Sequence, residues 1–113
     1  MSIIYHITSE ADWAAAKERG VYTAPSLEKQ GFIHCSTKEQ VMDIAEFLFK
    51  GRTDVVMLAI DEDNVEPTII YENLEGGERL FPHIYGELSI GTVVGDVKLT
   101  HDNNGEFIFP YEH

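Results

Sequence analysis

The run from Val55 to Ile60 constrains the fold most, because it has six apolar residues in succession. A strand with one face in water alternates apolar and polar side chains, whereas this run has no polar position. We therefore expect a strand that is covered on both faces and lies centrally in a sheet. Asp61 to Asn64 then turn the chain, and Thr68 to Tyr71 continue as a strand after Pro67. The missing N–H of that proline suits a sheet edge or the beginning of a strand.

Two segments have the signals of amphipathic helices. The first is expected from about Glu10 to Arg19, bounded by capping and stop signals at Ser9 and Gly20. The second follows a capping box formed by Ser36 and Glu39 and ends before Gly51. Its apolar residues recur with the spacing of one buried helical stripe, at Val41, Ile44, Ala45 and Leu48.

The remaining short apolar runs are expected to be strands. They are Ile3 to Ile7, Phe32 to Cys35, Phe81 to Gly86 and Thr92 to Leu99. In the last run, alternation predicts that Val93, Val97 and Leu99 share one face, with Asp96 and Lys98 on the other.

Turn signals separate these elements. Asn104-Gly105 predicts a hairpin that leads to Glu106 to Phe109. Val21 to Gln30 is irregular, and Pro25-Ser26 favours a turn or a brief helical turn there. An acidic, glycine-rich loop is expected at Glu72 to Glu78. The expected fold is a compact α+β single domain over residues 1–113, with a mixed, largely antiparallel sheet and two main helices.

Charge and cysteine content limit the partners. The 113 residues include twenty acidic and eight basic side chains, for a formal net charge of −12. This field repels phosphate backbones and anionic lipid, so broad nucleic-acid binding and membrane binding are not expected. Cys35 is the only cysteine, and the N-terminus has no export signal, so we expect a cytoplasmic protein. The sequence leaves the oligomeric state open.

Three of the five histidines occupy an unusual setting. His6, His34 and His83 each lie inside a short apolar run, whereas His101 and His113 are expected in a turn and at the terminus. Apolar surroundings disfavour the charged imidazole, which suits neutral rings that bind hydroxyls or transfer protons. The alternative, in which each ring is a core residue bonded to the protein, stays open. The strand spacing also gives each ring aromatic or hydroxyl neighbours on its own face.

Three motifs carry a family resemblance, namely IYHIT at 4–8, GFIHCST at 31–37 and FPHIYGEL at 81–88. Over nearly its whole length, the chain resembles the bacterial domain-of-unknown-function family numbered nine-five-two. That family in turn looks like a reduced relative of the ADP-ribosyltransferase fold, which includes RNA 2′-phosphotransferases and poly-ADP-ribosylating enzymes. The resemblance implies a transferase of that type and a small nucleotide-type ligand related to NAD, ADP-ribose or a 2′-phosphate.

The resemblance also implies roles for the three histidines as catalytic residues. His6 stands where a ribose hydroxyl of NAD is held, His34 where a ring stacks on nicotinamide, and His83 where many transferases have a catalytic Glu. We expect His83 to polarise the reacting group. The ligand-binding candidates beside them are Thr8, Ser36, Arg79 and Tyr85. Of these, Arg79 is the best isolated cation near His83, Tyr85 would be a supporting donor, and Ser36 would act at a helix N-terminus.

Two departures from the transferase pattern support a second hypothesis. Ile7 replaces the glycine that lets the backbone approach nicotinamide, and His83 replaces an acid that stabilises an oxocarbenium-like centre. The alternative is therefore a non-catalytic binding or interaction module that keeps the fold without the reaction.

No metal site is expected. Adjacent residues on a strand point to opposite faces, so His34 and Cys35 cannot easily bind one ion. Cys35 is interpreted as a packing residue, because only its place before a helix would activate its thiol. Asp61 and Asp63 imitate a calcium loop, but Glu66 stands where that loop requires Gly.

Overall fold

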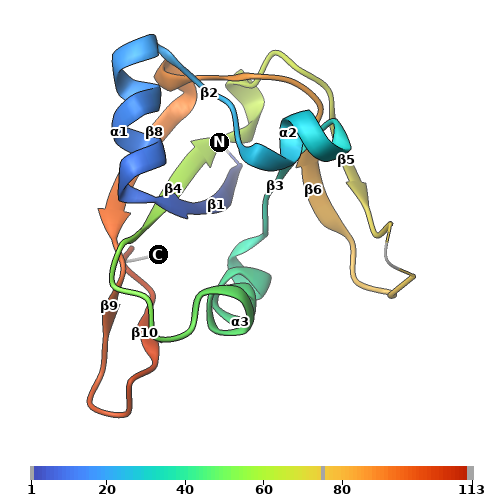
Figure 1. The fold of residues 1–113 in the computed structure, drawn as a ribbon. Coiled ribbons are helices and arrows are strands. Elements are labelled where there is room, and N and C mark those ends of the chain that lie inside the picture. The colour runs from blue at the N-terminus through green and yellow to red at the C-terminus, as the bar shows by residue number, and fades with distance from the viewer. Residues whose placement is uncertain (1, 75, 112–113) are drawn as a thin grey trace.

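The computed structural model describes residues 2–74 and 76–111, and these residues form an α+β fold with antiparallel strand pairing and three α-helices. Two three-stranded sheets lie on opposite sides of Figure 1. The larger sheet has the order β1-β4-β8, with β1 at Ile3–Ser9, β4 at Val55–Asp61 and β8 at Val93–Lys98. The smaller sheet has the order β3-β6-β5, with β3 at Ile33–His34, β6 at Phe81–Ile84 and β5 at Ile69–Glu72.

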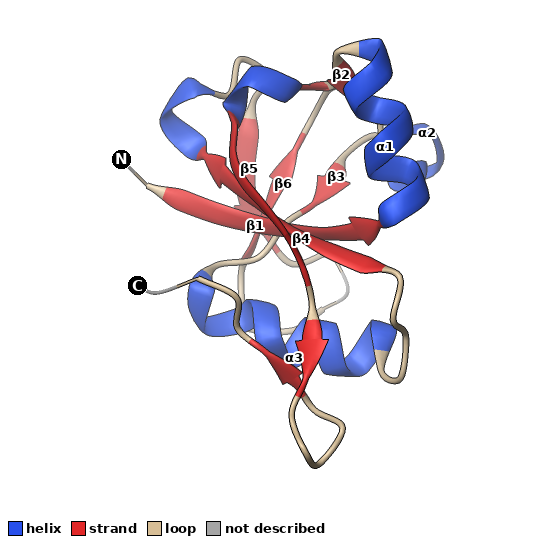
Figure 2. Ribbon diagram, turned by 90° about the vertical axis from the view of Figure 1, so that its left-hand side faces the viewer, coloured by secondary structure: helices blue, strands red, loops and turns tan. Residues whose placement is uncertain are grey.

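Strand β4 confirms the prediction from its sequence, because all seven of its residues are buried and it lies between β1 and β8. Its side chains alternate into two hydrophobic cores. Val56, Leu58 and Ile60 enter the core shared with α1 (Glu10–Arg19) and the smaller sheet. Val55, Met57 and Ala59 enter the core shared with α3 (Lys38–Phe49). In Figure 2, β1 and β4 accordingly lie between α3 on one side and α1 on the other.

Helix α1 has the predicted bounds because both of its ends have local signals. The Ser9 hydroxyl accepts the Asp12 N–H at 3.1 Å, and Gly20 ends the helix with φ +86°. Trp13 is buried and donates its indole N–H to Asp96 at 2.6 Å, which ties the helix to β8. A third helix, α2 at Pro25–Gln30, occupies the segment where a turn or brief helical turn was expected.

Helix α3 begins one residue later than its predicted capping box implies. Thr37 is the N-cap, and the Gln40 side chain accepts the Thr37 N–H at 3.0 Å. The Ser36–Glu39 box is wrong because Ser36 exchanges backbone hydrogen bonds with Tyr5 of β1, each of 2.8 Å. Ser36 is therefore an extended residue that joins the two sheets.

The buried face of α3 also differs from the predicted stripe. Val41 and Ala45 are buried as expected, but Ile44 is only partly buried and Leu48 is exposed. Phe49 packs against the core in their place. The helix has more apolar residues than one face needs, so the sequence alone does not show which of them contact the core.

Strand β8 contains a bulge that overturns the predicted alternation. Gly95 lies opposite Ala59 and Val93 lies opposite Ile60, so Val94 is the additional residue. Beyond a bulge the two faces exchange. Val93 therefore packs against the core shared with α1, whereas Leu99 lies in the core shared with α3, and the expected common face is wrong.

Two short antiparallel pairs complete the fold, β2 with β7 and β9 with β10. Their bounds, with those of two 3₁₀ turns, are β2 Val21–Tyr22, β7 Leu88–Ser89, β9 Thr100–His101, β10 Phe107–Ile108, η1 Glu62–Asn64 and η2 Ile90–Thr92. The Asn104-Gly105 hairpin is confirmed between β9 and β10. No helix in the described ranges is long and apolar enough to cross a bilayer.

The two remaining histidines had been expected outside regular structure. His101 lies in β9 and stacks on Phe107 with ring centroids 4.4 Å apart, so its placement in a turn is wrong. His113 lies outside the described residues.

Candidate functional site

Residues 33–36, which we call the seam, join the two sheets and bring the motifs at 4–8, 31–37 and 81–88 to one place. Ile33 and His34 pair with β6, and the Cys35 N–H donates to the Pro82 carbonyl at 3.0 Å. Ser36 then pairs with Tyr5 of β1. Side chains of β1, β3 and β6 therefore meet at the seam.

The rings of His34 and His83 meet across β3 and β6. Because Cys35 forms the neighbouring hydrogen bond, His34 and His83 face each other as a non-hydrogen-bonded pair, in which side chains come closest. Their ring centroids lie 5.2 Å apart. Phe32 stacks on His83 at 4.1 Å and lies edge-on to His34 at 4.8 Å, so the three rings form one aromatic group. His34 is exposed, and its Nε2 lies 2.7 Å from Gln30 Oε1.

His6 contacts the seam differently, because both of its ring nitrogens bond to the protein. Nδ1 donates to the His34 carbonyl, and Nε2 lies 2.7 Å from the Tyr22 hydroxyl. That hydroxyl is also 2.9 Å from Thr8 Oγ1. Burial lowers the pKa of His6 to about 4, so the ring is neutral at pH 7. His6 therefore holds the backbone of His34 in place.

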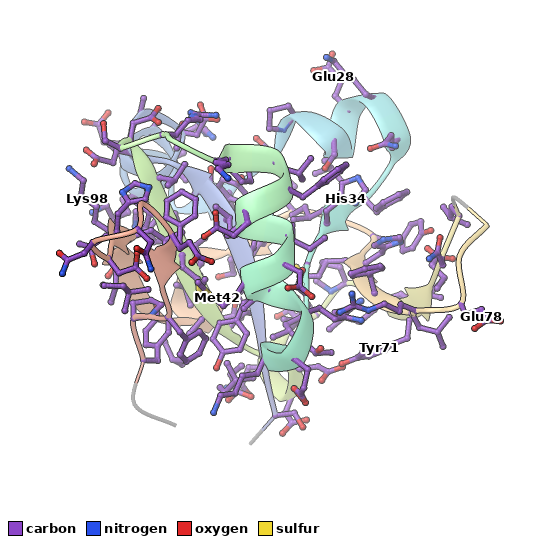
Figure 3. All side chains as sticks on the ribbon, turned by 90° about the horizontal axis from the view of Figure 1, so that it is seen from below. Glu28, His34, Met42, Tyr71, Glu78 and Lys98 are labelled. Atoms are coloured by element: carbon purple, nitrogen blue, oxygen red, sulfur yellow. The ribbon has the colours of Figure 1, made fainter. Side chains whose placement is uncertain are left out.

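A hollow of about 360 Å³, the first hollow, opens between α3, the second half of β1, and α2 with the seam. It is lined by four of the residues that the sequence predicted, and these come from two distant segments: His6, Thr8, His34 and Ser36. The wall on the helix side is apolar and includes Ile44 and Leu48. Figure 3 shows His34 on one side of α3 and Met42, which packs against the core, on the other.

A second hollow of about 250 Å³ lies between α3 and the end of β5 with the β5–β6 loop. His34, Ser36, Ile44 and Leu48 line both hollows, so they form a shared wall. His83 lines only the second hollow.

Glu72 completes the site, and sequence reasoning missed it by assigning it to an acidic loop. It is the last residue of β5, and its Oε2 accepts His83 Nδ1 at 2.9 Å and also the Tyr85 hydroxyl. The Tyr85 hydrogen bond, followed by that from His83, lowers the pKa of Glu72. The same contact raises the pKa of Tyr85. Tyr85 thus acts on His83 through Glu72.

Two arginines lie near the site, and only Arg52 lines one of the two hollows. Arg79 lies 3.6 Å from Asp43 and over the Phe81 ring, and it lines neither hollow. Arg52, which was not predicted, lines the first hollow and forms a bidentate pair with Asp54 at 2.8 and 2.7 Å. Its place one residue beyond the Gly51 stop signal was the only clue in the sequence.

Cys35 is buried beside the second hollow, and this burial raises the pKa of its thiol, which is therefore protonated at pH 7. Across residues 2–74 and 76–111, no three or more His, Cys, Asp or Glu side chains are grouped so as to hold a metal ion.

Comparison with known proteins gives a family and a fold. Residues 7–96 match the family model described as "Protein of unknown function (DUF952)". No curated protein matches the chain. A crystal structure of protein CC0527 from Caulobacter crescentus is 32% identical, with a TM-score of 0.84 over 95% of this chain and 94% of that one. The solution structure of CC0527 by NMR is 34% identical, with a TM-score of 0.81 over 94% and 91% of the two chains.

Proposed function

The chain belongs to the DUF952 family of proteins of unknown function, and from this premise we propose that its first hollow binds a small nucleotide-type ligand related to NAD, ADP-ribose or a 2′-phosphorylated nucleotide. The observation that carries the proposal is the common placement of His6, Thr8, His34 and Ser36 in one hollow. The resemblance of the motifs to the ADP-ribosyltransferase fold assigns two of these positions, His6 and His34, to the nucleotide.

The size and walls of the first hollow fit part of such a ligand. Its volume of about 360 Å³ lies at the lower end of small-molecule sites, which span roughly 300–1,000 Å³. The exposed His34 ring, supported edge-on by Phe32, offers a surface on which a planar base can stack. Ile44 and Leu48 form the apolar wall opposite.

The polar groups fit a sugar and one phosphate. The hydroxyls of Thr8 and Ser36 can donate to and accept from ribose hydroxyls. Arg52 is the only Lys or Arg among the described residues of the first hollow, and Asp54 offsets part of its charge. One partly neutralised cation and a net charge of −12 favour a small ligand with little charge over a polynucleotide.

In this proposal His6 is a positioning residue. Its two hydrogen bonds to the His34 carbonyl and the Tyr22 hydroxyl occupy the nitrogens that would hold a ribose hydroxyl. It orients His34 and, through Tyr22, Thr8. His34 is then the residue on which ligand binding depends most.

A non-catalytic binding module is the second candidate, and the occupied nitrogens of His6 favour it. A transferase of the ADP-ribosyltransferase type uses its first motif residue on the ribose, whereas both ring nitrogens of His6 bond to the protein. His83 in place of the usual acid favours the same candidate, because an imidazole lacks the negative charge with which an ionised acid stabilises an oxocarbenium-like centre.

Calorimetry with NAD, ADP-ribose and adenosine 2′-phosphate tests ligand binding. We expect at least one of them to bind, and His34→Ala to weaken that binding by about tenfold or more, which is about 1.4 kcal/mol. Arg79→Ala is the matched control, because it removes a nearby side chain outside both hollows. No heat and no shift of histidine NMR signals with any of the three would contradict the proposal.

Mass spectrometry of the bound ligand then separates the two candidates. Release of nicotinamide from NAD, with the ADP-ribosyl group transferred to water or to the 2′-phosphate, would support the transferase, and binding without these products would support the binding module.

A further inference from the structure

The pairing of His83 with Glu72 defines the hydrogen position on the His83 ring. A carboxylate only accepts hydrogen bonds, so the Nδ1 atom that lies 2.9 Å from Glu72 Oε2 carries the hydrogen. In the neutral ring, Nε2 then has a lone pair. A second donor to Glu72, the Tyr85 hydroxyl, keeps the carboxylate ionised and oriented.

His83 Nε2 has no hydrogen-bond partner among the described residues, although only 6% of the side chain is exposed. His101 Nε2 is the only fully buried side-chain nitrogen or oxygen without a partner in the described part of the chain. His83 Nε2 is therefore reachable by solvent, and the hollow that His83 lines is the second one. A nearly buried ring whose Nε2 has no partner thus lines an open space.

The walls of the second hollow favour an apolar body for any ligand that reaches this lone pair. Phe47, Leu48 and Leu74 line it, and these side chains are 82%, 59% and 63% exposed. None of the three belongs to either hydrophobic core. Exposed apolar side chains gathered around a hollow are typical of binding sites.

The charge of the second hollow and the state of the Cys35 thiol further limit the class of ligand that fits. None of the described residues that line the second hollow is Lys or Arg, and Glu72 places a negative charge there, so an anionic ligand is disfavoured. Cys35 is a protonated thiol and does not compete as a nucleophile. The group that suits the lone pair is a neutral hydroxyl.

We propose that the second hollow is a separate site for a neutral, hydroxyl-bearing ligand with an apolar body, and that His83, oriented by Glu72, is its general base. The ligand O–H bond breaks as the Nε2–H bond forms, and the resulting imidazolium faces the Glu72 carboxylate. This arrangement activates the ligand oxygen as a nucleophile. His83 and Glu72 line the second hollow and not the first, so the proposal does not depend on a nucleotide in the first hollow.

The first test uses the unmodified protein. Nitrogen NMR of the imidazole rings distinguishes the two neutral tautomers, and we expect His83 to carry its hydrogen on Nδ1. A hydrogen on Nε2 would remove the base and overturn the proposal.

The second test compares phenol with anisole, its O-methyl counterpart, which has the same aromatic body and no hydroxyl hydrogen. NMR titration should show that phenol shifts the His83 and Leu74 signals and binds about tenfold more tightly than anisole. Equal binding of the two, or binding of neither, would overturn the proposal. NAD and ADP-ribose titrations monitored at Thr8 report on the first hollow independently.

The third test measures the reactivity of Nε2 with diethyl pyrocarbonate, followed by peptide mass spectrometry. Nε2 attacks a carbonyl carbon, and the leaving carbonate ends as carbon dioxide and ethanol. We expect Glu72→Gln to slow modification of His83 by about tenfold, because the orientation of the ring is lost. Glu78→Gln is the matched control, since it removes one exposed charge from the loop after β5 and should leave the rate unchanged. Equal rates in the two variants would overturn the role of Glu72, and circular dichroism would verify that both are folded.

Discussion

His6 in the larger sheet and His83 in the smaller sheet are almost equally buried, with 8% and 4% of each residue exposed. They differ in their second ring nitrogen. His6 bonds to the protein through both nitrogens, whereas His83 bonds through Nδ1 alone. Burial therefore does not distinguish the two rings in this fold. The partner of the second nitrogen does.

The two sheets that hold these histidines also differ in how far their strands are covered. Strand β4 has both faces covered, by α1 and the smaller sheet on one side and by α3 on the other. Strand β5 is an edge strand, and none of its residues is fully buried. A sheet covered on both faces thus supports one side of the seam, and a sheet with an exposed edge strand supports the other.

The largest expected effect is a loss of stability when one apolar side chain of each sheet is shortened to alanine, which tests the contrast between the covered and the exposed strand. Leu58→Ala removes a fully buried side chain of β4 and should lower the free energy of unfolding by about 2–5 kcal/mol. Ile70→Ala on β5 removes a half-exposed side chain and should cost about 1 kcal/mol or less. Urea unfolding measures both, and equal losses would show that the two sheets contribute alike.

The next effect is a pH dependence that His6 alone should produce. Its pKa is about 4 in the folded protein against the usual 6.5, so the unfolded chain binds the proton more readily between these values. The contribution of neutral His6 to the free energy of unfolding is therefore complete above pH 6.5 and is lost as the pH falls toward 4. The whole loss is about 3 kcal/mol.

Urea unfolding at pH 7 and pH 4.5 measures this loss. In His6→Gln the difference between the two pH values should shrink by about 2 kcal/mol, because no imidazole titrates at this position. An unchanged difference would show that other groups cause the acid sensitivity.

A smaller effect comes from removing the hydroxyl beside each histidine. Tyr22→Phe leaves His6 Nε2 buried without a partner and should cost about 1–3 kcal/mol. Tyr85→Phe removes one donor to a Glu72 that keeps its bond to His83, and should cost less than Tyr22→Phe. Thermal or urea unfolding measures the stability loss in each variant. A larger loss in Tyr85→Phe than in Tyr22→Phe would contradict the distinction between His6, with both nitrogens bonded, and His83, with one.

The smallest effect belongs to the exposed ion pair of Arg79. Its guanidinium lies 3.6 Å from Asp43, and both side chains are more than half exposed. Arg79→Ala should therefore change the free energy of unfolding by less than about 1 kcal/mol, and less again in high salt. A larger loss in urea unfolding would show that the loop before β6 depends on this pair.

The sequence predicts the parts of the fold whose signals are local. Ser9 and Gly20 bound α1, the uninterrupted apolar run marks β4, and Asn104-Gly105 marks the last hairpin. Where a distant strand decides, prediction fails. Ser36 pairs with Tyr5 instead of capping α3, and the bulge at Val94 is set by pairing with β4.

The candidate site shows the same limit. Four predicted residues line the first hollow, yet their roles in binding stay predictions. The sequence could not indicate that Tyr22 and the His34 carbonyl occupy both nitrogens of His6. Nor could it indicate Glu72, whose contact with His83 depends on the pairing of β5 with β6.

The wall that the two hollows share has a thermodynamic consequence. An occupant on one side that turns the His34 ring or moves Leu48 also reshapes the space on the other side. Linkage then requires each occupant to change the affinity of the other by the same factor. A titration of one in the presence of the other would measure that factor directly, in either order of addition.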